Sequence, residues 1–120
     1  MRAVLCTWNL KTDTAGKLRY FCLREGIGFR PVGAAECSQP IRKLVIASPS
    51  AESVSLPFPD EMLLMAGFTS LQLDRLLEFL REKGIPIPLK AVMTASNARW
   101  DSLRLYQELC AEHQAMNGTP

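Results

Sequence analysis

The spacing of hydrophobic and polar residues changes along the chain and predicts strands that are followed by helices. The segment Glu61–Phe68, EMLLMAGF, is apolar on both sides of an extended chain, which is typical of a central strand buried on both faces. In the segment that follows, leucines recur at helical spacing: Leu73, Leu76, Leu77 and Leu80. Polar residues occupy the opposite side, so the pattern predicts an amphipathic helix that packs on the strand.

Both ends of this helix are marked in the sequence. Thr69 and Gln72 fit a capping box, in which each side chain bonds the backbone N–H of the other residue. Gly84 is expected to close the helix in the left-handed conformation, and Pro86 and Pro88 cannot continue it. We therefore expect the chain to leave the helix extended and to form a second strand, IPIPLKAVMT.

The same order of elements occurs earlier in the chain. Residues Ala3–Trp8 form an apolar run suited to a buried strand, a helix that ends at Gly26 follows, and Phe29–Val32 suits a second strand. The sequence LREGI at 23–27 parallels LREKGI at 80–85, and the apolar positions of the two helices correspond at a constant offset. We interpret this likeness as an internal duplication of a strand–helix–strand unit.

The chain divides into three segments within a single domain. Residues 1–46 hold the first unit and a short helix after Pro40, and residues 61–116 hold the second unit and a C-terminal helix, Trp100–His113. Between them, residues 47–60 are rich in serine and proline and lack periodicity, which is typical of a linker. A chain of 120 residues with 48 % apolar content is large enough to bury one core.

A duplicated strand–helix–strand unit predicts an α+β fold. We expect a ferredoxin-like sheet with two helices on one face and the C-terminal helix covering the second face. The alternative is an α/β fold, a three-layer doubly wound sheet in which the short helix after Pro40 is a crossover. The two folds differ in which strand ends share an edge of the sheet.

Net charge and the N-terminal sequence narrow the range of functions. The formal net charge of +2 and the lack of a basic stripe argue against nucleic acid or an anionic membrane surface as a partner. The N-terminal segment is unlike a signal peptide, and no run of about eighteen apolar residues occurs. We therefore expect a cytoplasmic protein with no nucleic-acid partner and no membrane partner.

The four cysteines form no recognisable metal or catalytic motif. Cys6, Cys22, Cys37 and Cys110 are irregularly spaced and lack a C-x-x-C pair. We expect free thiols packed as small apolar groups, with no metal and no cofactor. Cys6 and Cys110 are the candidates for thiol chemistry, but Cys110 and His113 lie near a helix C-terminus, where the dipole disfavours a thiolate.

Polar and aromatic residues next to the predicted strands are the candidate binding residues. They are Trp8 and Asn9 at the end of the first strand, Gln39 after the second, and Thr94, Asn97 and Trp100 after the last. An asparagine amide can bond a ligand, and an indole can stack on it. The simpler interpretation is structural, with Asn97 or Asp101 capping the last helix and Trp100 anchoring it to the sheet. Whether these residues share one site depends on the strand order.

Several motifs in the second half of the chain point to a known family. They are the MLLMAGF strand, the L-x-x-L-L-x-x-L-R helix, PLKAV at 88–92, and T-x-x-N-x-x-W at 94–100. Through them the chain resembles a bacterial family of uncharacterised proteins, the domain of unknown function 3783 family. The first half is similar more loosely, through LREGI at 23–27 and QPI at 39–41, with Arg42 where the family pattern has glycine. The resemblance implies a bacterial protein without an established activity.

The sequence favours a small non-catalytic binding or regulatory module. We expect no enzyme active site, because the set of ionisable residues needed for catalysis is missing. Apolar strand faces and a tryptophan-bearing helix suit packing against a second copy of the chain, as a homodimer, or against another protein partner. The alternative is a thiol-dependent enzyme or redox protein that uses Cys6 or Cys110. No small-molecule ligand is identified by the sequence.

Overall fold

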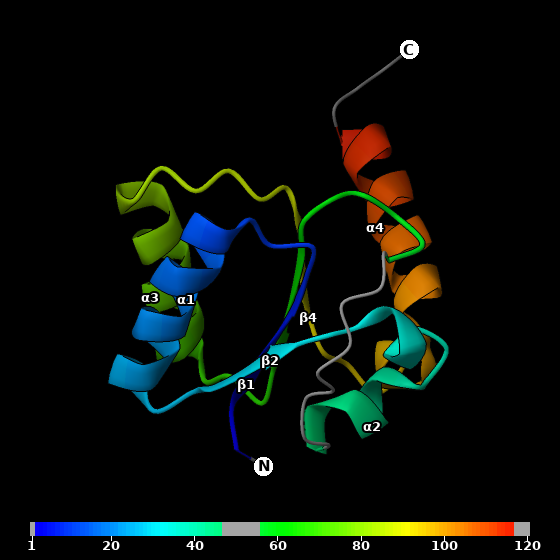
Figure 1. Cartoon of the computed structure of the whole chain (residues 1–120), viewed down its shortest axis with the longest axis horizontal. Coiled ribbons are helices and arrows are strands. Elements are labelled where there is room, and N and C mark those ends of the chain that lie inside the picture. Colours follow the sequence, from blue (N-terminus) through cyan, green and yellow to red (C-terminus); the bar gives the residue numbers. More distant parts are fainter. Residues whose placement is uncertain (1, 47–55, 117–120) are drawn as a thin grey trace.

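The computed structural model describes residues 2–46 and 56–116, so most of the expected linker lies outside the described residues. The elements follow one another as β1 (Val4–Trp8), α1 (Thr12–Glu25), β2 (Gly28–Pro31), the 3₁₀ turn η1 (Ala34–Glu36), α2 (Ile41–Ile46), β3 (Met62–Ala66), α3 (Ser70–Glu82), β4 (Leu89–Val92), the 3₁₀ turn η2 (Asn97–Arg99) and α4 (Ser102–Met116). Helices α1 and α3 lie together on one side of the sheet, and α2 and α4 lie on the other (Figure 1). No helix within the described ranges has the length and apolar character needed to cross a membrane.

The sheet has four strands in the order β2-β1-β3-β4. β1 is parallel to β2 and β3 is parallel to β4, whereas the central strands β1 and β3 run antiparallel, with Trp8 opposite Met62. The mixed α+β class and the helix covering the second face are therefore confirmed. The ferredoxin-like topology is not confirmed. In that fold the strands of the two units interleave, whereas here β1 lies beside β2 and β3 lies beside β4 within each unit. Three layers are present as in the alternative, but the central pair is not parallel.

Equivalent residues of the two units lie 58 positions apart through the first strand and the helix. β1 begins at Val4 and β3 at Met62, and α1 and α3 begin at Thr12 and Ser70. The described residues with a left-handed backbone conformation form two pairs with the same spacing: Asn9 with Gly67 and Gly26 with Gly84. The agreement extends from element boundaries to single backbone angles, and it supports the duplication inferred from the sequence.

The correspondence continues after the helix with a spacing of 61, because the second unit contains the additional segment Pro86–Pro88. α2 begins at Ile41 and α4 at Ser102, and the backbone N–H of each of these residues bonds a carbonyl in the other unit. The backbone N–H of Ile41 donates to the carbonyl of Trp100 at 2.9 Å, and that of Ser102 donates to the carbonyl of Cys37 at 3.1 Å. The second helix of each unit is thus tied to the connecting segment of the other.

Two hydrophobic clusters occupy the two sides of the sheet. Under α1 and α3 lie Leu5, Leu18, Phe21, Leu63, Leu76 and Phe79. Under α2 and α4 lie Cys6, Trp8, Leu44, Leu64 and Leu105. β3 is buried on both faces, as its sequence predicts. On α3 the expectation was wrong at one position, because Leu77 is exposed and Phe79 packs inward instead, with its ring centroid 4.9 Å from that of Phe21.

Candidate functional site

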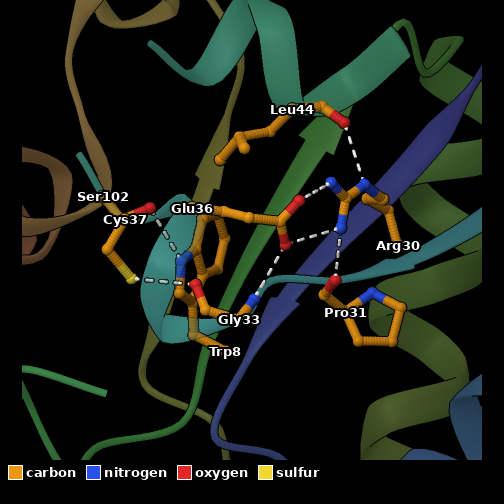
Figure 2. Close-up of polar contacts among 8 residues, drawn as sticks. All are labelled: Trp8, Arg30, Pro31, Gly33, Glu36, Cys37, Leu44 and Ser102. Atoms are coloured by element: carbon orange, nitrogen blue, oxygen red, sulfur yellow. Dashed lines mark hydrogen bonds and ion pairs between the residues drawn. The ribbon is translucent and has the colours of Figure 1, made fainter. Parts of the chain in front are cut away.

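Two of the expected binding residues join β1 to distant parts of the chain. Trp8 is completely buried, and its indole N–H donates to Ser102 Oγ at 2.9 Å (Figure 2). Asn9 has a φ of 58°, and its side-chain amide donates to the carbonyls of Phe58 and Asp60 at 2.6 and 3.1 Å. Trp8 therefore fastens β1 to α4, and Asn9 fastens the end of β1 to the segment that enters β3.

Thr94 and Asn97, two of the expected binding residues after β4, bond each other and close a turn. The backbone N–H of Thr94 donates to Asn97 Oδ1 at 2.8 Å, and that of Asn97 donates to Thr94 Oγ1 at 3.1 Å. The Asn97 amide also donates to the carbonyl of Val92 at 3.0 Å. Asn97 does not cap α4 as expected. Asp101, the other candidate cap, does cap α4 and accepts the N–H of Arg104 at 2.9 Å, because η2 intervenes between Asn97 and the helix.

Trp100 and Gln39 complete the set of expected binding residues. Trp100 is half-buried against the cluster under α4, and the guanidinium of Arg104 lies 4.9 Å from its ring centroid. The Gln39 side chain is exposed, and its backbone N–H donates to the carbonyl of Glu36 at 3.1 Å. Trp8 and Trp100 thus belong to the same packed side of the sheet, where they support the junction of α2 and α4.

Arg30 and Glu36 form a buried ion pair that the sequence patterns did not single out. The exposed fraction is 3 % for Arg30 and 7 % for Glu36. The guanidinium donates to both carboxylate oxygens (Figure 2). Arg30 also donates to the carbonyls of Pro31 at 2.6 Å and Leu44 at 3.0 Å. Glu36 accepts the N–H of Gly33 at 3.0 Å. The hydrogen bond from Arg30 holds the pKa of the Glu36 carboxyl below its usual range.

The second unit supports its corresponding turn with a single side chain. Asn97 occupies the position equivalent to Glu36, and Ala91 the position equivalent to Arg30. The amide oxygen of Asn97 accepts the N–H three residues before it, as the carboxylate of Glu36 does. The amide nitrogen donates to the last carbonyl of β4, and the guanidinium of Arg30 donates to the last carbonyl of β2. The two arrangements are therefore equivalent supports, which only an alignment of the two units could have revealed.

The cysteine side chains are free thiols, three of them buried. Burial raises the pKa of Cys6 and that of Cys22 to about 12, and it raises the pKa of Cys37 as well. A thiol with so high a pKa is protonated near neutral pH and is a poor nucleophile. Across residues 2–46 and 56–116, no group of three His, Cys, Asp and Glu side chains is arranged to hold a metal ion.

A groove of about 500 Å³ opens between α1 and α3, and we name it the basic groove. Its walls include Gly16, Lys17, Tyr20 and Arg24 of α1 and Phe79 and Lys83 of α3. Three of these side chains are cationic, whereas the one carboxylate at the groove, Asp13, lies 3.2 Å from Lys17. Tyr20 is 61 % exposed, with the guanidinium of Arg24 5.8 Å from its ring centroid. The arrangement offers positive charge next to an accessible aromatic surface.

Comparison with known proteins bears on the second unit. Residues 61–116 match the model of the family described as Domain of unknown function (DUF3783). The matched segment runs from the residue before β3 to the end of α4, which is the whole second strand–helix–strand unit with its following helix. No curated protein and no solved structure matches the chain. The match to the DUF3783 family therefore covers the second unit, residues 61–116, and not the first.

Proposed function

We propose that the chain is a small non-catalytic binding or regulatory module and that its ligand site is the basic groove. The observation that supports this proposal is the contrast between two sets of polar side chains. Those of Trp8, Asn9, Thr94 and Asn97 make bonds inside the protein, whereas Tyr20, Arg24 and Lys83 of the basic groove are exposed to solvent. Ligand sites are typically concave, with a few polar groups beside apolar surface.

The base of the groove is rigid enough to present these groups in a fixed arrangement. α1 and α3 pack against the sheet and against each other through the rings of Phe21 and Phe79. Side chains on packed helices are held more precisely than side chains on loops. The alternative function, thiol chemistry, gains little support at Cys6, because the Cys6 thiol is completely buried under α2 and α4.

A screen of small molecules by two-dimensional ¹H–¹⁵N NMR tests the proposed site. Binding is expected to shift the backbone amides of Gly16, Tyr20 and Lys83, because these residues line the groove. The amides from Thr94 to Trp100 should stay unchanged. Ligands that shift the Thr94–Trp100 amides and leave those of the groove in place would contradict the proposal.

The same spectra, recorded over a range of protein concentrations without ligand, report on self-association. Leu23 of α1 and Leu71 of α3 are exposed on the same helix layer, and this observation favours a homodimer as a second function. Shifts on this layer that grow with protein concentration would identify the dimer. Spectra that do not change with concentration would remove it.

A further inference from the structure

A second groove on the same helix layer occupies positions equivalent to those of the basic groove. This twin groove has a volume of about 310 Å³, and its walls include Phe21, Glu25, Arg75, Glu78 and Glu82. Each of these residues lies 58 positions from a residue of the basic groove: Phe79, Lys83, Lys17, Tyr20 and Arg24, respectively. The two grooves therefore share one backbone framework and differ in their side chains.

The difference is clearest at an ion pair between the two helices. In the twin groove Arg75 Nη1 lies 2.9 Å from Glu25 Oε1 and links α3 to α1. The equivalent positions in the basic groove hold Lys17 and Lys83, which are both cationic. At the position where the twin groove has the carboxylate of Glu25, the basic groove has the ammonium group of Lys83. An anion from outside the protein would complete this arrangement.

Three further positions on α1 are not acidic, although their equivalents on α3 are. α3 carries a stripe of carboxylates at helical spacing: Asp74, Glu78 and Glu82. The equivalent residues of α1 are Gly16, Tyr20 and Arg24. No repulsive carboxylate is left on that stripe, and an aromatic ring and a guanidinium take the place of two of them. This half of the layer is therefore suited to a ligand that is both anionic and planar.

Gly16 is the residue in this groove that packing does not explain. A Cβ at this position would meet no atom within 4 Å, and Gly16 is not among the described residues with positive φ. Glycine inside a helix is destabilising relative to alanine, because it loses more conformational freedom on folding. Neither turn geometry nor close packing requires the glycine, and its missing side chain leaves the wall of the groove open to a flat ligand.

We infer that the basic groove binds a small ligand with a carboxylate or phosphate group on an aromatic ring. This inference rests on the function proposed above and names the chemical class of the ligand. The anionic group lies between Lys17 and Lys83, in the role that the Glu25 carboxylate has in the twin groove. The ring lies along Gly16 against Tyr20. Lys17 remains shared with Asp13, 3.2 Å away, so Lys83 makes the larger contribution.

Titration of the full chain with four probes tests the ligand class by ¹H–¹⁵N NMR. Phenyl phosphate and benzoate carry both the ring and the anion, whereas inorganic phosphate and phenol each carry one of them. We expect phenyl phosphate or benzoate to shift the amides of Gly16 and Lys83 at concentrations where phosphate and phenol do not. Comparison of these two probes identifies the preferred anion. Added salt should weaken binding, because the lysines are near the surface.

Charge-reversal variants make the test specific to the groove. The Lys83→Glu variant restores the carboxylate of the twin groove and is expected to weaken binding by about tenfold or more, because attraction becomes repulsion. Gly16→Asp places the equivalent of Asp74 in the groove and should have the same effect. Lys43→Glu, an equal change of charge on exposed α2, is the matched control and should bind as the unmodified chain does.

A negative result for the ligand class can be distinguished from a negative result for the site. If phenol shifts the groove amides as strongly as phenyl phosphate, and Lys83→Glu binds both equally, the ligand class is wrong and the groove remains a binding site. If none of the four probes shifts the amides of Gly16, Tyr20 or Lys83, the inference is overturned. If fragments of every other class also leave them unshifted, the proposed site is overturned too.

Discussion

Replacing Glu36 with alanine is expected to lower the free energy of unfolding by about 3–5 kcal/mol, the range typical of a broken buried ion pair. Arg30 would stay buried and lose the bonds to the Glu36 carboxylate, and the N–H of Gly33 would lose its acceptor. Because a domain of this size is stable by only about 5–15 kcal/mol, the effect should be large in a urea titration followed by circular dichroism.

The second unit supplies the control for this prediction. The double variant Arg30→Ala, Glu36→Asn copies the pair Ala91 and Asn97, which supports the equivalent turn without a buried charge. It should be clearly more stable than Glu36→Ala, because the buried guanidinium is removed together with the carboxylate. A double variant as unstable as the single one would contradict the equivalence of the two turns. A loss below about 1 kcal/mol for Glu36→Ala would show that the ion pair contributes little.

Glu36 also gives the stability a dependence on pH. Its pKa is lowered in the folded state, so the unfolded chain binds the proton more readily. The contribution of this carboxylate is therefore fully present above its unfolded pKa of about 4.3 and is lost as the pH falls through the folded pKa. The Arg30→Ala, Glu36→Asn variant lacks the titrating group, so its stability should fall less steeply in that acidic range.

Replacing Trp8 with alanine is expected to cost about 3–5 kcal/mol, the range for deleting a large aromatic side chain from a core. Trp8 is completely buried under α4, and the change also removes the donor to the buried Ser102 hydroxyl. Thermal unfolding followed by circular dichroism measures the loss. If Trp8→Ala does not fold, Trp8→Phe keeps most of the apolar volume and isolates the hydrogen bond, which is worth about 0.5–1.5 kcal/mol.

The matched control is the other tryptophan of the chain. Trp100 is half-buried, with its indole ring under the guanidinium of Arg104. Because less apolar area is lost, Trp100→Ala should be less destabilising than Trp8→Ala. A larger loss at Trp100 than at Trp8 would contradict the packing described for this side of the sheet.

The local structure was well predicted where the determining interactions are close in the sequence. The capping box of α3 is present, with the N–H of Thr69 2.8 Å from Gln72 Oε1 and that of Gln72 3.1 Å from Thr69 Oγ1. The Schellman closure at Gly84 is also present, because the N–H of Ile85 donates to the carbonyl of Leu80 at 2.9 Å. Both arrangements involve residues within one or two helical turns, which a pattern of residue types can specify.

The strand order could not be predicted in the same way. Whether β1 lies beside β2 depends on pairing between distant segments, and the apolar pattern of β1 suits either neighbour. The role of Arg30 was missed for a related reason. A single arginine in a short strand gives no signal, and its partner Glu36 lies beyond the end of that strand.

The basic groove was missed because its residues lie on the solvent side of the helices. Side chains there are ordinarily only solvated, so neither periodicity nor a motif marks Lys17 or Lys83. Comparison of the two units inside the structure supplied the missing signal. Equivalent backbone positions with opposite charge, such as Glu25 and Lys83, mark where the two units differ.

A crystal structure of the full chain with phenyl phosphate or benzoate tests the central claim most directly. We predict electron density for the anion between the ammonium groups of Lys17 and Lys83, with the ring beside Tyr20 and the backbone of Gly16. Density for the probe at the turn from Thr94 to Trp100, with the basic groove holding no ligand, would contradict the account.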